Sequence, residues 1–133
     1  MNEQTITEAH GACRSMYTAL TELLELTNEL SEAIQRQDQV SVQLFLSMRQ
    51  EPLDRLRVCD TRLRRLCSLL PPAEGAQLRQ VLNGQGGGTA ATQGLERTVR
   101  QNRQLLEQIT RIDERLNRRM GGKKSFYEQH ASQ

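Results

Sequence analysis

The sequence contains no tryptophan, and only two phenylalanine and two tyrosine residues occur among its 133 residues. Large aromatic rings fill much of a wide globular core, so this chain has to build its core mainly from leucine and smaller apolar side chains. Such side chains suit a thin core. The composition therefore favours an elongated helical bundle over a spherical domain.

The sequence also lacks a long apolar run and a secretion signal. No segment approaches the ~18 consecutive apolar residues that a membrane-spanning helix needs. The N-terminal residues MNEQTITEAH contain neither the basic stretch nor the apolar core of a signal peptide. We therefore expect a protein of the cytoplasm that does not insert into a membrane, and we expect its three cysteines to be free thiols.

Residues suited to catalysis or metal binding are scarce. The two histidines, His10 and His130, lie near opposite ends of the chain, and neither has cysteine or carboxylate neighbours at the spacing of metal ligands. The glycine-rich residues 84–88 are not followed by the lysine that a phosphate-binding loop needs, and no Gly-x-Ser-x-Gly motif is present. We predict no catalytic residue, no metal site, no cofactor and no enzyme activity.

Apolar residues instead recur every seven residues along the first part of the chain, which predicts a helix over about residues 5–36. Tyr17 and Leu24 widen this seam, which indicates contact with two neighbouring helices rather than one. The two rows of the seam are Ile6, Cys13, Leu20, Thr27 and Ile34, and Ala9, Met16, Leu23 and Leu30.

A second helix is predicted over about residues 39–70, with Asp38 as its N-cap. Pro52 interrupts this segment, and an interior proline costs a helix ~3 kcal/mol. We therefore expect either a kink near Met48 or two abutting helices. The prolines at positions 71–72 are expected to end the segment.

The following residues, 71–94, are predicted to form a flexible connector, because six of the nine glycines lie between residues 73 and 94. At most one short helix is expected there, around residues 76–82. A third long helix is predicted over about residues 95–120, ending at two glycines. Its apolar face carries Leu95, Val99, Asn102, Leu105, Leu106, Ile109, Ile112, Leu116 and Met120.

Helices of similar length favour side-by-side antiparallel packing. The fold class is therefore expected to be all-α, in a single domain over residues 1–133. The domain would be an elongated antiparallel three-helix bundle, or a helical hairpin plus a tethered third helix. The tail, residues 121–133, has no periodicity but contains Phe126 and Tyr127, which form either a short docking element or a pair that folds back onto the bundle.

Charge is unevenly distributed along the chain. Residues 1–36 contain six acidic and two basic side chains, whereas residues 37–133 contain ten acidic and sixteen basic ones. Arginines clustered at 55–65 and 111–119 are able to grip phosphates, but interspersed acids, missing aromatic residues and a pI near 8.6 argue against nucleic acid as a partner. We favour solvated basic faces that pair with the acidic first helix.

Two segments resemble FlgN-type flagellar export chaperones. LLELTNELSEAIQRQDQVSVQLFLSMRQEPLDRL, residues 23–56, is similar to the first helical hairpin of that family. QNRQLLEQITRIDERLNRRMGGKKSFYEQH, residues 101–130, is similar to its C-terminal helix and tail, with a tyrosine shortly after a glycine. Glu128 follows Tyr127 as in other members, but the glycine that often comes next is missing.

The resemblance implies a cytoplasmic type III export chaperone that binds the amphipathic C-terminal segments of hook-filament junction proteins. Such a chaperone prevents premature assembly of its clients and delivers them to the flagellar export gate, with Tyr127 as the candidate for contact with that gate. The apolar face of the third helix is the candidate client site, unless it only completes a closed three-helix core. This site comprises Val99, Asn102 as a polar register point, Leu105, Leu106, Ile109, Ile112 and Leu116.

Three alternatives remain at the level of the sequence. A chaperone of the filament cap protein would have the same helical character. A structural homo-oligomer, or a homodimer, would use the apolar seams between copies of the chain. A nucleic-acid binder would show steeply salt-dependent binding.

Overall fold

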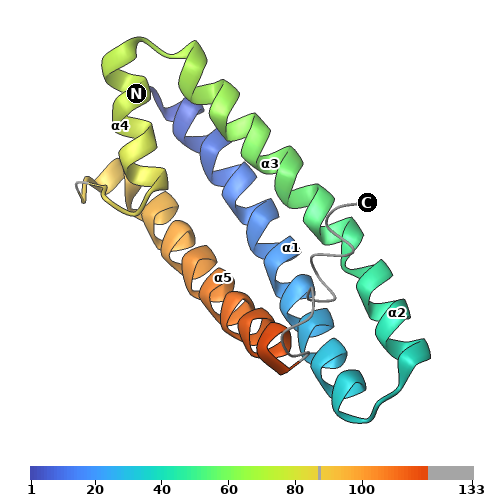
Figure 1. Ribbon diagram of the computed structural model, residues 1–133. Helices are drawn as coiled ribbons and strands as arrows, with labels where there is room; N and C mark the ends of the chain where they lie inside the picture. Colours follow the sequence, from blue (N-terminus) through green and yellow to red (C-terminus); the bar gives the residue numbers. More distant parts are fainter. Residues whose placement is uncertain (87, 120–133) are drawn as a thin grey trace.

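The computed structural model describes residues 1–86 and 88–119, which form helices joined by short turns and contain no strand (Figure 1). The expected all-α class is therefore confirmed for this part of the chain. The helices are α1 (Glu3–Gln35), α2 (Gln39–Met48), α3 (Gln50–Leu69), α4 (Pro72–Leu82), the short 3-10 helix η1 (Ala90–Thr92) and α5 (Gln93–Arg119).

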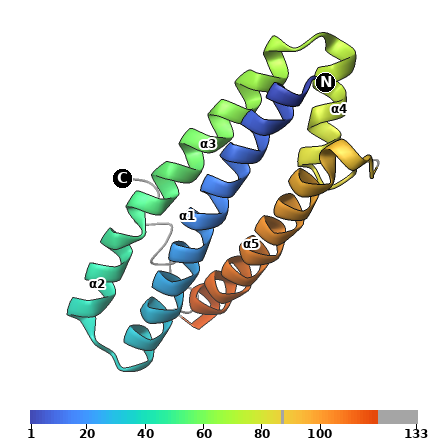
Figure 2. The ribbon, with the colours of Figure 1, turned by 180° about the vertical axis from the view of Figure 1, so that it is seen from behind.

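Helix α1 is the centre of the architecture. Its N-cap is Asn2, whose Oδ1 accepts a hydrogen bond from the Thr5 backbone N–H at 2.8 Å. The heptad seam of α1 is buried along most of its length, since α3 and α2 pack on one side of it and α5 on the other. Figures 1 and 2 show this order from opposite sides, with α1 between α3 and α5.

The segment that contains Pro52 forms two abutting helices that meet at Arg49. Pro52 is the third residue of α3, within the first turn. Backbone N–H groups in a first turn have no intrahelical acceptor, so proline removes no hydrogen bond there. The Asp38 side chain caps α2 by accepting a hydrogen bond from the Ser41 backbone N–H at 3.1 Å.

The short helix expected around residues 76–82 is present as α4, but it begins at Pro72, so the predicted flexible connector is wrong for residues 72–75. Pro72 begins this helix rather than only ending the one before it, as suits a residue with a fixed φ and no N–H. Leu78 and Val81 are buried in the core. A Cβ added to Gly75 would lie 2.6 Å from the Cys67 carbonyl oxygen. The glycine that suggested flexibility therefore allows α4 to approach α3 closely.

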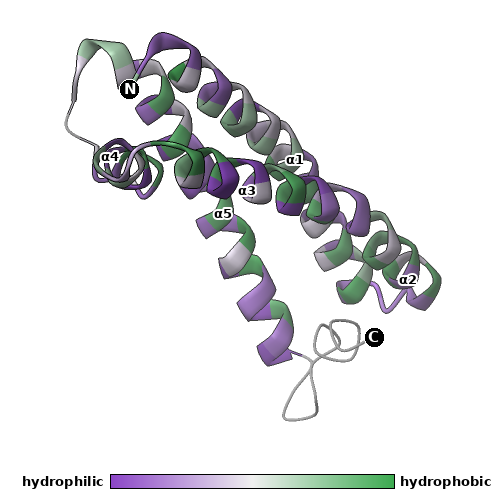
Figure 3. Cartoon of the chain, turned by 90° about the horizontal axis from the view of Figure 1, so that it is seen from above, coloured by the Kyte–Doolittle hydropathy of each residue, from purple (hydrophilic) through white to green (hydrophobic). Residues whose placement is uncertain are grey.

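Three hydrophobic clusters follow one another along the bundle. The α4-end cluster joins α1, α3, α4 and α5 around Ala9, Leu63, Leu78 and Leu95. The middle cluster contains Leu20, Leu23 and Ile109, and the α2-end cluster contains Leu30, Ala33, Val42, Ile112 and Leu116. Helix α5 contributes to all three clusters, and its alternation of hydrophilic and hydrophobic residues is visible in Figure 3.

An open groove between two helices

A groove with a volume of about 940 Å³ lies along α1 between α3 and α5, and we call it the α3–α5 groove. Its floor is Cys13, Met16 and Leu20 of α1. The wall from α3 consists of Leu53, Leu56, Arg57, Asp60, Leu63, Arg64, Cys67 and Ser68. The opposite wall is Val99, Asn102, Arg103 and Leu106 of α5, and one end is lined by Arg79, Leu82 and Asn83.

The groove exists because α3 and α5 both pack on α1, and contacts near its two ends join the helices that form its walls. At one end, α4 packs against both α3 and α5. At the other end, the Arg49 guanidinium donates a hydrogen bond to Asp113 Oδ2 at 3.0 Å, which links the α2–α3 junction to α5. The Arg49 side chain is only 6% exposed, so this ion pair is largely withdrawn from water.

The structure divides the predicted client site on α5 into two groups. Val99, Asn102 and Leu106 line the groove, and of these Val99 and Asn102 are only 5% and 8% exposed. Leu105 packs against the middle cluster and is only partly exposed. Ile109, Ile112 and Leu116 are buried in the middle and α2-end clusters. Ile109 therefore faces α1 and α3, and Ile112 and Leu116 face α1 and α2. Tyr127 lies outside the described residues.

Asn102 fixes the position of α5 on α1. Its Nδ2 donates a buried hydrogen bond to the Cys13 backbone carbonyl at 2.9 Å. A hydrogen bond from a buried amide is specific to one register, because a shift of α5 would leave the donor without an acceptor.

The wall from α3 and the floor from α1 were not predicted from the sequence as parts of a site. Leu53, Leu56 and Leu63 recur at helical spacing within the predicted second helix. Their spacing was the available signal. It did not reveal which helices would stand apart, because that depends on where α4 is inserted.

The thiols in the groove behave as apolar groups. Burial raises the pKa of Cys13 to about 11, and burial also raises the pKa of Cys67. Both thiols are therefore neutral near pH 7. A neutral thiol is a poor nucleophile, because the thiolate is the reactive form. Their contribution to the groove is apolar surface rather than reactivity.

His10 lies away from the groove and joins α1 to the start of α5. Its Nε2 is 3.0 Å from Thr98 Oγ1. Burial, together with the positive charge of Arg14, lowers the pKa of His10. Within residues 1–86 and 88–119, no group of three or more His, Cys, Asp or Glu side chains is arranged to hold a metal ion.

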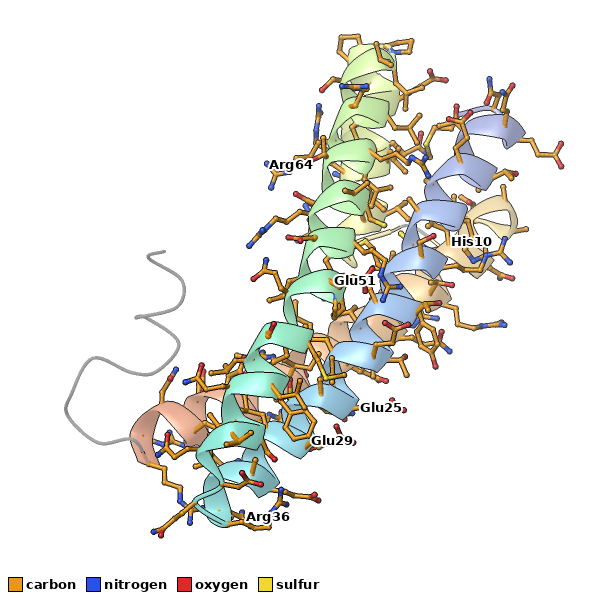
Figure 4. All side chains as sticks on the ribbon, turned by 90° about the vertical axis from the view of Figure 1, so that its right-hand side faces the viewer. His10, Glu25, Glu29, Arg36, Glu51 and Arg64 are labelled. Atoms are coloured by element: carbon orange, nitrogen blue, oxygen red, sulfur yellow. The ribbon has the colours of Figure 1, made fainter. Side chains whose placement is uncertain are left out.

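The arginines are distributed over several faces. Arg55 pairs with Glu22 of α1 and with Glu51 of its own helix. Arg64 projects from α3 on the opposite side of the molecule from Glu25 and Glu29 of α1 (Figure 4). Another basic face is formed by Arg111, Arg115 and Arg118 around Glu114 on α5. Among the described helices, none is long and apolar enough to cross a membrane.

Comparison of the chain with protein-family models, with curated proteins and with solved structures found no match.

Proposed function

We propose that this protein is a chaperone that holds an amphipathic helical segment of another protein in the α3–α5 groove. The observation that carries the proposal is the groove itself, an open apolar channel along the central helix of a bundle. Helix-in-groove recognition needs such a channel, because the apolar face of the guest replaces a missing helix of the host.

The dimensions of the groove suit a helical guest. The wall from α3 extends from Leu53 to Ser68, which corresponds to a length of ~22 Å at ~1.5 Å per residue. A guest helix of about four turns has the same length. Leu106 is 52% exposed on the opposite wall and would be covered by such a guest.

The resemblance to FlgN-type chaperones supplies the proposed identity of the client. It is carried by residues 23–56 and 101–130, which include α2, the beginning of α3 and most of α5. On this basis the clients are the C-terminal segments of hook-filament junction proteins, the chaperone acts in the cytoplasm, and Tyr127 contacts the export gate. Leu106 and the wall from α3 form the client site, and Val99 and Asn102 lie at its base, where they are only 5% and 8% exposed.

Isothermal titration calorimetry with C-terminal segments of junction proteins tests the proposal. Leu106→Asp places a carboxylate where the apolar face of the guest would lie, and we expect it to weaken binding at least ~10-fold. Val58→Asp is the matched control, because Val58 is 66% exposed on α3 and does not line the groove. Equal affinities of the two variants for the junction-protein segments would contradict the proposal that the client binds in the groove.

The filament-cap alternative differs only in its client. Capture of the cap protein rather than the junction proteins by the full-length chain, followed by calorimetry with the purified cap segment, would favour it. The same Leu106→Asp and Val58→Asp pair then reports whether the groove is used.

A second candidate function, self-assembly, is favoured by the outer face of α2. This helix contains no charged residue, and Val40, Leu44 and Met48 are exposed at intervals of four residues. Exposed apolar stripes are typical of interfaces between subunits. Light scattering that shows a stable dimer or larger assembly, lost on Leu44→Asp and accompanied by no client binding, would support this function instead.

A further inference from the structure

The α3–α5 groove is chemically different at its two ends. Three arginines line the end near α4: Arg64 from α3, Arg79 from α4 itself, and Arg103 from α5. The Arg103 guanidinium is placed there by a 2.7 Å hydrogen bond to the Asn83 backbone carbonyl at the end of α4. Toward the middle of the bundle, the lining includes Leu53 and Leu106, and the one arginine there, Arg57, is paired with Asp54 of its own helix at 3.0 Å.

The positive charge at the α4 end is only partly compensated. Arg64 pairs with Asp60 at 2.8 Å in its own helix. Arg79 and Arg103 form no ion pair within the part of the chain that the structure describes. A carboxylate brought to this end would find two arginine guanidinium groups with remaining N–H donors.

We infer that the groove selects an amphipathic helix whose apolar face lies over the leucines and whose last turn carries acidic side chains against Arg79 and Arg103. The inference rests on the proposed function and adds the charge and orientation of the guest. The C-terminal end of a helix already carries partial negative charge on its free carbonyls, so arginines stabilise that end rather than the N-terminal end. Acidic side chains add to the same attraction.

The charge of the groove also argues against the chain's own tail as the occupant. Residues 120–133 contain Lys123 and Lys124 but only one acidic residue, Glu128. A basic segment is repelled by the arginines at the α4 end. A guest with an acidic end is attracted to them.

Three designed peptides of about 16 residues with the same leucine face test the inference. The first carries three glutamates in its last turn, the second has glutamines there, and the third has the glutamates in its first turn. Fluorescence anisotropy with the full-length chain should show the first peptide binding at least about fivefold more tightly than the other two at low salt. High salt should reduce this preference, because the charges lie at an open surface.

Two double variants of the chain test whether Arg79 and Arg103 cause the preference for the first peptide. Arg79→Gln combined with Arg103→Gln should remove the preference for the first peptide. Arg97→Gln combined with Arg100→Gln is the matched control, because both of these arginines are exposed on α5 and neither lines the groove. The control should keep the preference. Equal affinity for the three peptides, or a preference that survives Arg79→Gln and Arg103→Gln, overturns the inference.

Junction-protein segments measured in parallel separate this inference from the proposed function. If they bind while the peptides show no charge preference, the inference is wrong and the proposed function stands. If they do not bind while the first peptide is selected, the client identity is wrong and the inference stands.

Discussion

The two halves of α5 have the same apolar spacing but different surroundings. In the second half, Ile109, Ile112 and Leu116 are buried against α1, α2 and α3. In the first half, Leu95 and Val99 are also buried, but Leu106 is 52% exposed and lines an open groove. The difference arises because α4 packs against both α3 and α5, whereas Val42 of α2 packs in one cluster with Ile112 and Leu116 of α5. An amphipathic stripe thus marks a face that needs a partner but does not identify the partner.

Aspartate substitutions in the two halves of α5 test most directly whether the halves differ in burial. Ile109→Asp should lower the free energy of unfolding by about 4 kcal/mol or more, because it places a carboxylate beside Leu20 and Leu23 in the middle cluster. Leu106→Asp should change it by less than about 0.5 kcal/mol, because the side chain is half exposed. Urea unfolding followed by circular dichroism measures both. Similar losses would show that the groove is closed in solution.

Removal of the ion pair at the α2 side of the groove should have the next largest effect. Arg49→Ala leaves Asp113 without its 3.0 Å partner and should cost about 2 kcal/mol, less than for a fully buried pair because the Asp113 side chain is 27% exposed. A double-mutant cycle with Asp113→Ala isolates the pairwise contribution. Additive losses in the cycle would mean that the two residues act independently.

Alanine substitution of two helical glycines compares the packing of α4 with that of α1. Gly75→Ala should destabilise the protein by about 1–3 kcal/mol, because the new Cβ would lie 2.6 Å from the Cys67 carbonyl oxygen. Gly11→Ala has open space and should stabilise it by up to about 1 kcal/mol through higher helix propensity. Thermal unfolding of the two variants measures whether each substitution lowers or raises the stability of the protein. A stabilising Gly75→Ala would place α4 farther from α3.

The smallest predicted effect is a pH dependence at the start of α5. The pKa of His10 is lower in the folded protein than its usual value near 6.5, so the unfolded chain binds more protons around that pH. Stability from this group is therefore present above about pH 6.5 and decreases as the pH falls through that value. Thermal midpoints between about pH 7.5 and pH 5.5 should decrease less for His10→Gln than for the natural protein. Parallel pH profiles for the two proteins would contradict this assignment.

Much of the candidate site could not be predicted from the sequence, because the groove depends on the position of α4. Gly75 and the glycines after it lowered the expected helicity of residues 71–94, and helix propensity is easily overridden by packing. Leu78 and Val81 were the available signal for a buried helix, at a spacing of three residues. Once α4 is present, the separation of α3 from α5 follows, and so does the arginine-lined end of the groove.

The sequence by itself determined the three long helical segments and the faces they bury. The heptad seam of α1, the cap at Asp38 and the break before Pro52 each follow from local periodicity, hydrogen bonding or backbone geometry. Only the tertiary structure decided which stretch of each face is covered. Coverage depends on the distance between helices far apart in sequence, and here a short helix between α3 and α5, tolerated by one glycine, sets that distance.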